Sequence, residues 1–309
     1  MNAIGPVHRI KNAEGLFLKF GIITRNQNSW CSTKLQESLV KHNIQYVCFS
    51  FPKIIARVKH EPMLKAQDTD MLRDLAALII RPIGRGSIEE LVFRLDILYR
   101  LQRFGSYIIN SPEAIEHCVD KYDVITLLEE NNIPVPRTAV TENVYEALNA
   151  FKELDSDVIV KPLFGSRGIG ATRIMDSDIA STVFKAITFY HGVIYLQEYV
   201  PHGYSDIRVF VVGDRVVAAM RRVADNWKTN YSQGARPESI KIDKSIEDLA
   251  IKSARVVGCR IAGVDVLESQ RGPIVLEVNS QPGWKGLQSV TSVNIADEII
   301  DFVLSELKK

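Results

Sequence analysis

The sequence predicts a mixed α/β (α+β) protein, with an open α/β sheet first and antiparallel hairpins after it. From residue 16 to about residue 110, short apolar runs alternate with helical stretches, which is typical of βαβ units. Beyond residue 155, apolar runs are joined by short turns, which is typical of antiparallel strand pairs. The 309 residues, 46% hydrophobic and 24% charged, supply enough apolar side chains for two or three cores.

The composition disfavours several classes of protein. A formal net charge of +1 gives no global reason to expect a nucleic acid or a membrane surface as partner. No run reaches the roughly 18 apolar residues of a membrane span, and the first fifteen residues lack the apolar core of a signal peptide. The four cysteines lie far apart with no C-x-x-C pair, so we expect reduced, mostly packed thiols in a cytoplasmic protein.

The first unit is expected to bind ligands at the carboxyl ends of its strands, as open α/β sheets do. Its first strand, at 18–24, is followed by a polar loop, and the strand at 76–81 leads into the loop RPIGRG. In that second loop Arg81 and Arg85 could grip an anionic substrate by paired hydrogen bonds, with a solvated loop as an equal alternative. The helix expected at 88–104 buries leucines at helical spacing.

A glycine-rich loop follows the strand at 157–160. After Lys161, the loop GSRGIG at 165–170 leads into a returning strand at 171–175. Glycines have no β-carbon, so the backbone can approach a polyphosphate and direct its amides at it. The loop is neither a Walker loop nor a Rossmann fingerprint, because no Gly-Lys-Ser/Thr follows and no helix starts there. A simple hairpin turn remains an equal alternative when this segment is taken alone.

A candidate metal site lies near the end of the chain. Residues 263–267 and 273–279 predict two adjacent antiparallel strands, joined by a turn at 268–272. Asp265 lies on the first strand, and Glu277 and Asn279 leave the same face of the second. These hard oxygen donors suit Mg²⁺, although strand carboxylates are often merely solvated. The polar turn that follows Asn279 favours the metal interpretation.

A charged loop follows a second hairpin, whose turn is expected at 213–214. Arg222, Lys228 and Asn230 in and before this loop would suit a triphosphate and an acyl intermediate. A solvated loop is the alternative, and only the other signals favour the functional interpretation. No Gly-x-Ser-x-Gly or His-Glu-x-x-His motif is present, which disfavours hydrolases and zinc proteases.

In combination, these motifs resemble the ATP-grasp superfamily over about residues 81–309, and within it the RimK-like amino-acid ligases. The motifs that carry the resemblance are Lys121, Lys161 with GSRGIG at 165–170, QEY at 197–199, DIR at 206–208, KTN at 228–230, GVD at 263–265, and EVNSQPG at 277–283. The segments at 220–230 and 110–112 most resemble the archaeal branch of the family.

The resemblance implies a three-part ATP-grasp fold with ATP held between the last two parts. The expected divisions are an N-terminal extension at 1–15, an open α/β domain at 16–110, a central flap domain at 111–195, and a C-terminal antiparallel-sheet domain at 196–309.

The resemblance also implies roles for individual residues. By analogy with the family, Lys121, Lys161 and the glycine flap would bind phosphates, and the backbone of the QEY segment would contact adenine. Asp206 would reach toward the sugar of the nucleotide, and Arg222 would stabilise an anionic tetrahedral intermediate. The cofactor-binding set is Lys121, Lys161, Gly165, Ser166, Gly168, Gly170, Gln197, Glu198, Tyr199, Asp206, Arg208, Lys228, Thr229 and Asn230. The catalytic set is Arg222, Lys228 and Asn230, and the metal set is Asp265, Glu277 and Asn279.

The implied reaction is ATP-dependent, ADP-forming ligation of L-glutamate to a carboxylate acceptor through an acylphosphate. Two Mg²⁺ ions are expected, with Mn²⁺ as the alternative ion. A small pterin coenzyme is the favoured acceptor, because the loop after Arg222 is shorter than in the ribosomal-protein ligases. A deazaflavin coenzyme, an amino-group carrier protein or a ribosomal protein are the alternatives. We also expect a homo-oligomer, either a dimer or a tetramer.

Overall fold

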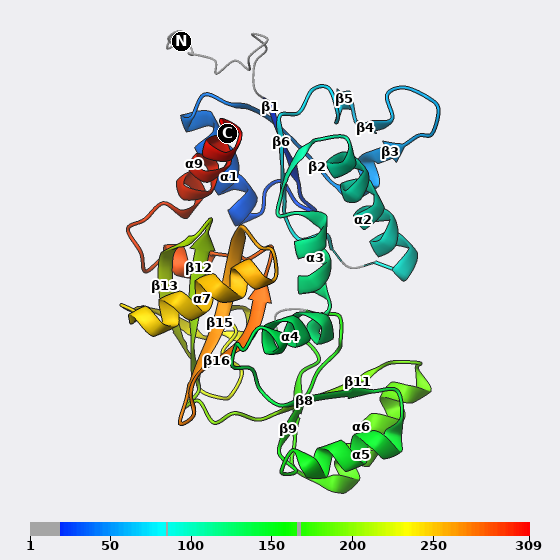
Figure 1. Cartoon of the computed structure of the whole chain (residues 1–309), viewed down its shortest axis with the longest axis vertical. Coiled ribbons are helices and arrows are strands. Elements are labelled where there is room, and N and C mark those ends of the chain that lie inside the picture. The colour runs from blue at the N-terminus through cyan, green and yellow to red at the C-terminus, as the bar shows by residue number, and fades with distance from the viewer. Residues whose placement is uncertain (1–18, 85, 166–167) are drawn as a thin grey trace.

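The computed structural model describes residues 19–84, 86–165 and 168–309 (Figure 1). The predicted N-terminal extension, Arg85, Ser166 and Arg167 lie outside these ranges. The mixed α/β prediction is confirmed: the described residues form three larger sheets and one small sheet, with helices packed against them. No helix in the described ranges is both long and apolar enough to cross a membrane.

The first sheet is parallel and buried on both faces. Its strand order is β2 (Gln45–Phe49), β1 (Lys19–Ile23), β6 (Ala77–Ile80) and β7 (Tyr107–Ile109). Side chains alternate between faces with period two. Ala77 and Ile79 therefore face α1 (Trp30–Lys41), while Leu78 and Ile80 face α2 (Ile88–Arg103). This double burial explains the continuous apolar runs in the sequence.

A small antiparallel sheet interrupts this unit and was missed by the sequence prediction. It consists of β3 (Ile54–Ala56), β4 (Leu64–Ala66) and β5 (Thr69–Asp70), after a 3₁₀ turn at Phe51–Lys53. Strands of two or three residues are too short to show an alternating pattern.

Two capped helices connect the first sheet to the second. Ser111 accepts a hydrogen bond from the Ala114 amide at the start of α3 (Pro112–Val119), with proline at the first position as expected. Asp120 caps α4 (Lys121–Glu130) in the same way. The predicted lysine thus begins the second helix, and α4 packs against the C-terminal sheet.

The second sheet carries the glycine loop. Its order is β10 (Thr172–Ile174), β9 (Val158–Val160), β11 (Ile194–Glu198) and β8 (Thr138–Thr141), all antiparallel neighbours. Helices α5 (Val144–Glu153) and α6 (Ser177–Phe189) pack on it and form a separate core at the bottom of Figure 1. The predicted hairpin around the glycine loop is confirmed by the β9–β10 pairing.

The third sheet is antiparallel and has five strands. Its order is β14 (Arg236–Ser239), β13 (Arg215–Val223), β12 (Ser205–Val212), β15 (Ile261–Ser269) and β16 (Gly272–Asn279). Helix α7 (Lys244–Val256) lies across one face (Figure 1). After the short α8 (Lys285–Gln288), α9 (Ile295–Glu306) returns to pack against α1, so that one core joins the first and third sheets.

Of the two hairpin turns predicted for this sheet, one is confirmed and the other is shorter than predicted. The turn at Gly213 and Asp214 joins β12 and β13 as expected. The turn between β15 and β16 is shorter than predicted, because Ser269 already pairs with Gly272 and only Gln270 and Arg271 remain outside the strands. The longer polar run had suggested a loop of five residues.

Candidate active site

A cleft with an empty volume of about 900 Å³ lies between the glycine hairpin and the five-stranded sheet. Most of the predicted site residues line it: Lys121, Lys161, Gly165, Gly168, Gln197, Glu198, Tyr199, Asp206, Arg222, Lys228, Thr229, Asn230, Asp265 and Glu277. Three predicted residues, Gly170, Arg208 and Asn279, are outside this lining. The predicted Ser166 is outside the described residues. The structure thus gathers residues that are more than 150 positions apart along the chain.

The glycine loop closes against the loop that follows β13. Gly168 has a φ of +68°, and a β-carbon at this position would lie 2.3 Å from Oδ1 of Asn230. Gly170 has a φ of +80° and packs against Pro162, where a β-carbon would lie 2.9 Å from the ring. Both positions therefore require glycine for their backbone conformation and for close approach. Two predicted phosphate-binding segments meet at Gly168 and Asn230.

Two lysines lie at one end of the cleft. The Lys161 ammonium donates to Oε1 of Gln197 at 2.8 Å. The Lys121 ammonium donates to the carbonyls of Leu163 and Gly165, at 3.0 and 2.8 Å. Lys121 therefore holds the base of the glycine loop, which the sequence did not predict. Each ammonium has three N–H groups, so both lysines retain donors for an anion.

The lysine side is our name for Lys121, Lys161 and Glu277. Burial lowers the pKa of Lys161 to about 8, with the opposing attraction of Glu277 and the repulsion of Lys121 as smaller effects. Burial likewise lowers the pKa of Lys121. Both lysines are partly buried, and a partly desolvated cation without a carboxylate in hydrogen-bonding contact is unfavourable, so a bound anion would relieve that cost.

Glu277 and Asn279 leave the same face of β16, as predicted. The register places Asp265 opposite Glu277 and Gly263 opposite Asn279. Asn279 donates through Nδ2 to the Gly263 carbonyl at 3.3 Å. Among the described residues, neither the Glu277 carboxylate nor Oδ1 of Asn279 accepts a hydrogen bond. Glu277 lines the cleft, whereas Asn279 lies outside its lining.

The arginine side is our name for Arg208, Arg222, Asp206 and Asp265. Strand register creates it, because Arg208 lies opposite Asp265 on β12 and β15, and Asp206 lies opposite Arg222 on β12 and β13. Arg208 donates to both oxygens of Asp265, with Nη2 to Oδ2 at 2.7 Å. Arg222 donates to both oxygens of Asp206, with Nε to Oδ1 at 2.7 Å, and its Nη2 lies 3.0 Å from Oδ2 of Asp265.

Charges in this network control one another's protonation. Burial alone would lower the pKa of Arg222, but Asp265 and Asp206 outweigh burial and raise it. Burial alone would raise the pKa of Asp265, but Arg208 and Arg222 outweigh burial and lower it. The side chains of Arg222 and Asp265 are only 4% and 2% exposed. The two arginines and two aspartates thus form a charge-balanced, buried group.

The comparison with known families agrees with this geometry. A model of the RimK-like ATP-grasp domain matches residues 118–303. The chain belongs to the RimK-like ATP-grasp family. The matched range contains every predicted site residue from Lys121 to Asn279. The expected ATP-grasp fold is confirmed as well, since solved ATP-grasp ligases superpose on most of the chain.

Two relatives illustrate this RimK-like ATP-grasp membership, and one solved structure illustrates the fold. The tetrahydromethanopterin:α-L-glutamate ligase of Methanococcus maripaludis is 37% identical and covers 94% of this chain and 100% of its own length. The enzyme of that name from Methanocaldococcus jannaschii is 36% identical over the same shares. The ATP-grasp ligase PsnB, solved with a minimal precursor, Mg and ADP, superposes with a TM-score of 0.72 at 20% identity. It covers 94% of this chain and 97% of its own. The chain is an ATP-dependent ligase.

In this ATP-grasp chain the QEY segment is held by arginines that the sequence prediction missed. Glu198 accepts from Nε of Arg137 at 2.7 Å and from Arg271, and its own amide donates to the Arg137 carbonyl at 2.9 Å. The guanidinium of Arg173 lies 3.5 Å from the centroid of the Tyr199 ring. These arginines lie at a strand end, on a strand and in a turn. None of them belongs to a sequence motif, so the sequence pattern did not identify them.

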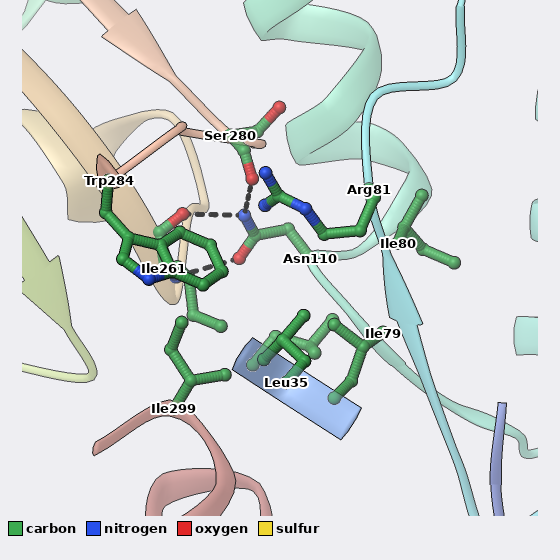
Figure 2. Close-up of a pocket in the computed structure, with 10 residues that line it drawn as sticks. Leu35, Ile79, Ile80, Arg81, Asn110, Ile261, Ser280, Trp284 and Ile299 are labelled. Atoms are coloured by element: carbon green, nitrogen blue, oxygen red, sulfur yellow. Dashed lines mark hydrogen bonds between the residues drawn. The ribbon is translucent and has the colours of Figure 1, made fainter. Parts of the chain in front are cut away.

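The prediction that Arg81 grips a substrate is wrong. Arg81 is buried, donates from Nη2 to the Pro282 carbonyl at 2.9 Å, and lies 4.8 Å from the Trp284 ring. Figure 2 shows it beside Asn110, whose Nδ2 donates to the carbonyls of Ile261 and Ser280 at 2.7 and 2.6 Å. Arg81 and Asn110 therefore fasten the first sheet to the turn that follows Asn279.

Proposed function

We propose that this ligase joins L-glutamate to a carboxylate of a tetrahydromethanopterin-type coenzyme, consuming ATP and releasing ADP and phosphate. The observation that carries the proposal is the lysine side, where two partly buried lysines and an open carboxylate meet the glycine loop in one cleft. The relatives that match nearly the whole chain are named tetrahydromethanopterin:α-L-glutamate ligases, which supports the choice of substrates.

ATP would place its phosphates on the lysine side. Lys161 and Lys121 supply positive charge there, and the backbone around Gly168 closes over the site next to Asn230. Lys228, 5.1 Å from the Trp227 ring, supplies a further cation from the opposite loop. PsnB, which shares the fold, was solved with Mg and ADP, which supports a nucleotide in the equivalent region.

The oxygen donors of β16 fit a magnesium ion. The Glu277 carboxylate and Oδ1 of Asn279 are hard ligands without a hydrogen-bond partner among the described residues. Both oxygens of Asp265 already accept from arginines, so Asp265 fits less well as a primary ligand. Bound there, Mg²⁺ would supply neutralisation of the charge that develops on the phosphates. A second ion, and Mn²⁺ as the alternative, remain expectations.

The reaction would need little covalent chemistry from the protein. An acceptor carboxylate oxygen attacks the γ-phosphorus, and the bond to ADP breaks. The α-amino nitrogen of glutamate then attacks the acyl carbon, phosphate leaves with the electron pair, and the amine loses its proton. Lys161 and Lys121 would orient the phosphates, and the approach of Gly168 to Asn230 would help to exclude water from the acylphosphate.

Arg222 fits the predicted role of stabilising the anionic tetrahedral intermediate. It lines the cleft, and among the described residues its Nη1 has no hydrogen-bond partner, whereas Nε and Nη2 are held by carboxylates. A held guanidinium with one open nitrogen is a preorganised donor. Asp206, predicted to reach the nucleotide's sugar, would instead act as a positioning residue, because Arg222 donates to both its oxygens.

A different acceptor is the alternative function. Solved ligases that bind precursor peptides share this fold, but at 21% identity or less they show the fold alone. A deazaflavin coenzyme, an amino-group carrier protein and a ribosomal protein remain the other candidates. We also propose domain divisions at residues 15, 110 and 195, a cytoplasmic location, and a dimeric or tetrameric state. Light scattering tests the oligomeric state.

Mass spectrometry with labelled glutamate, ATP and each candidate acceptor tests the proposal. We expect a glutamate adduct on tetrahydromethanopterin, with one ADP released for each glutamate added. The Glu277→Gln protein should form no adduct, while Glu238→Gln, on the exposed strand β14, should behave like the wild type. An adduct on another acceptor alone would refute the pterin assignment, and full activity of Glu277→Gln would refute the site.

A further inference from the structure

Two thiols from distant segments meet on the side of the molecule covered by α3. Cys118 lies near the end of α3, and Cys259 lies between α7 and β15. Their sulfur atoms are 3.5 Å apart, although the residues are separated by 141 positions, and both thiols are free. The sequence predicted reduced, mostly packed thiols, and spacing alone gives no sign of this contact.

Packing on both sides holds this contact in place. Gly258 has a φ of +76° and ends α7 in the left-handed conformation that favours glycine. A β-carbon at Gly258 would lie 3.7 Å from that of Ala114, so α3 rests directly on the end of α7. Ala114 and Cys259 belong to the same buried core, next to partly buried Cys118. The two sulfurs are therefore held together by the fold.

The two cysteines differ in access to solvent. Cys259 is only 2% exposed, whereas Cys118 is partly exposed. A reagent from solution would therefore meet Cys118 first. A disulfide has a sulfur separation of about 2.05 Å, so the sulfurs would have to approach by roughly 1.5 Å. Cys118 is the second-last residue of α3, and Cys259 follows the C-cap of α7, so both residues stand next to helix ends.

We propose that Cys118 and Cys259 form a thiol–disulfide modification site, which a low-molecular-weight disulfide such as oxidised glutathione converts into an intramolecular disulfide. Because both residues lie outside the cleft lining, the proposal does not rest on the ligase reaction.

The exchange balances in two steps. The Cys118 thiolate attacks one sulfur of oxidised glutathione, the disulfide of the reagent breaks, and one glutathione thiolate leaves. Cys259 gives its proton to a thiolate and attacks the Cys118 sulfur, and the second glutathione leaves. The contact with Cys118, together with burial, raises the pKa of Cys259, which disfavours the Cys259 thiolate needed in the second step. Two protein thiols are oxidised, and two glutathione thiols are produced.

The bond would close a long loop of the chain. Such a crosslink restricts the unfolded chain more than the folded one, and so raises stability. Here the disulfide would link α3 to the turn that precedes β15, the strand that carries Asp265. We therefore expect the oxidised protein to melt at a higher temperature, and dithiothreitol to reverse the change.

The test treats the full chain with oxidised glutathione at mildly alkaline pH, alkylates the remaining thiols, and measures intact mass and linked peptides. We expect loss of two hydrogens, a peptide linking Cys118 to Cys259, and alkylation of Cys31 and Cys48. Cys259→Ser should stop at one glutathione on Cys118, and Cys118→Ser should form neither product. The double variant Cys31→Ser/Cys48→Ser, which keeps the proposed pair, should respond as the wild type does.

Three results would overturn the proposal. The first is the absence of the linked peptide from oxidised wild-type protein. The second is a rise in melting temperature in Cys259→Ser as large as that in the wild type. The third is faster modification of Cys31 or Cys48 than of Cys118. None of these outcomes depends on glutamate ligation, so failure of the proposed function would leave this test intact.

Discussion

The lysine side and the arginine side border the same cleft, with only Arg208 of these residues outside its lining, but their charged groups are paired in opposite ways. On the arginine side, two guanidinium groups and two carboxylates are opposite one another in strand register and hydrogen-bonded in pairs. On the lysine side, the ammonium groups of Lys161 and Lys121 bond to an amide oxygen and two carbonyls, and the carboxylate of Glu277 accepts no hydrogen bond from a described residue.

The difference indicates which side holds the shape of the cleft and which side binds the polyphosphate. A paired, buried ion network is strongly destabilised when one member is removed, so it fixes geometry. The two lysines are partly buried and have no paired carboxylate, so their positive charge is available to an anionic ligand. The arginine side should therefore matter most for stability, and the lysine side for nucleotide binding. Four predictions test this contrast, from the largest expected effect to the smallest.

Replacing Arg222 with methionine should lower the free energy of unfolding by about 3–5 kcal/mol, because it leaves Asp206 and Asp265 buried with too little positive charge. Urea unfolding measures the loss. The matched control is Arg221→Met on the same strand, whose ion pair with Glu268 is partly exposed and should contribute at most about 1 kcal/mol. Equal losses in both variants would contradict a structural role for the arginine side.

Replacing Lys161 with methionine should lower kcat/KM for ATP by about 10²–10³-fold, because the side chain keeps its length but loses the charge that faces the phosphates. Steady-state kinetics with varied ATP measure the effect. Lys152 is an exposed lysine in the last turn of α5, so Lys152→Met should leave kcat/KM for ATP unchanged. A loss of only a few fold at Lys161 would remove it from the phosphate site.

The pH profile of kcat/KM for ATP should fall as pH rises through about 8, because free-enzyme Lys161 loses its proton there. Arginine remains charged throughout this range. The fall near pH 8 should therefore disappear from Lys161→Arg if that protein retains activity, and Lys152→Arg should keep it. An unchanged profile in Lys161→Arg would assign the titration to another group.

In the absence of nucleotide, Lys161→Met should be more stable than the wild type by about 1–2 kcal/mol at neutral pH, since burial disfavours the charged amine. The folded pKa of about 8 is below the unfolded value of 10.5, so the unfolded state binds more protons between these pH values. Wild-type stability should therefore rise with pH across this window, and the difference should shrink. Thermal unfolding from pH 7 to 10 measures it, and a less stable variant at pH 7 would contradict the account.

The sequence predicted those features that depend on local pattern. β6 lies within the predicted range, since Ala77–Ile80 is an apolar run bounded by polar residues. The face shared by Glu277 and Asn279 follows from period two alone, whereas the place of Asp265 opposite Glu277 depends on strand register. Gly168 was selected for backbone freedom, which its φ of +68° confirms. The roles of these residues in binding ATP and metal remain predictions.

The features that the sequence could not show depend on which residues the tertiary fold places next to one another. Asp265 looked like a free metal ligand, but strand register places Arg208 opposite it. Arg81 looked like an anion-binding residue at a strand end, but its partner Pro282 lies 201 positions later. The Cys118–Cys259 contact has the same origin. Chemistry can be recognised from residue types, whereas pairing requires the tertiary arrangement.

The most direct test of the central claim follows oxygen from the acceptor to phosphate. Tetrahydromethanopterin labelled with ¹⁸O in its carboxylates is incubated with the enzyme, ATP and L-glutamate, and the released phosphate is examined by mass spectrometry. If the cleft forms an acylphosphate, each phosphate should carry one ¹⁸O atom, in step with ADP and the glutamate adduct. Unlabelled phosphate alongside the adduct, or release of AMP instead of ADP, would contradict the account.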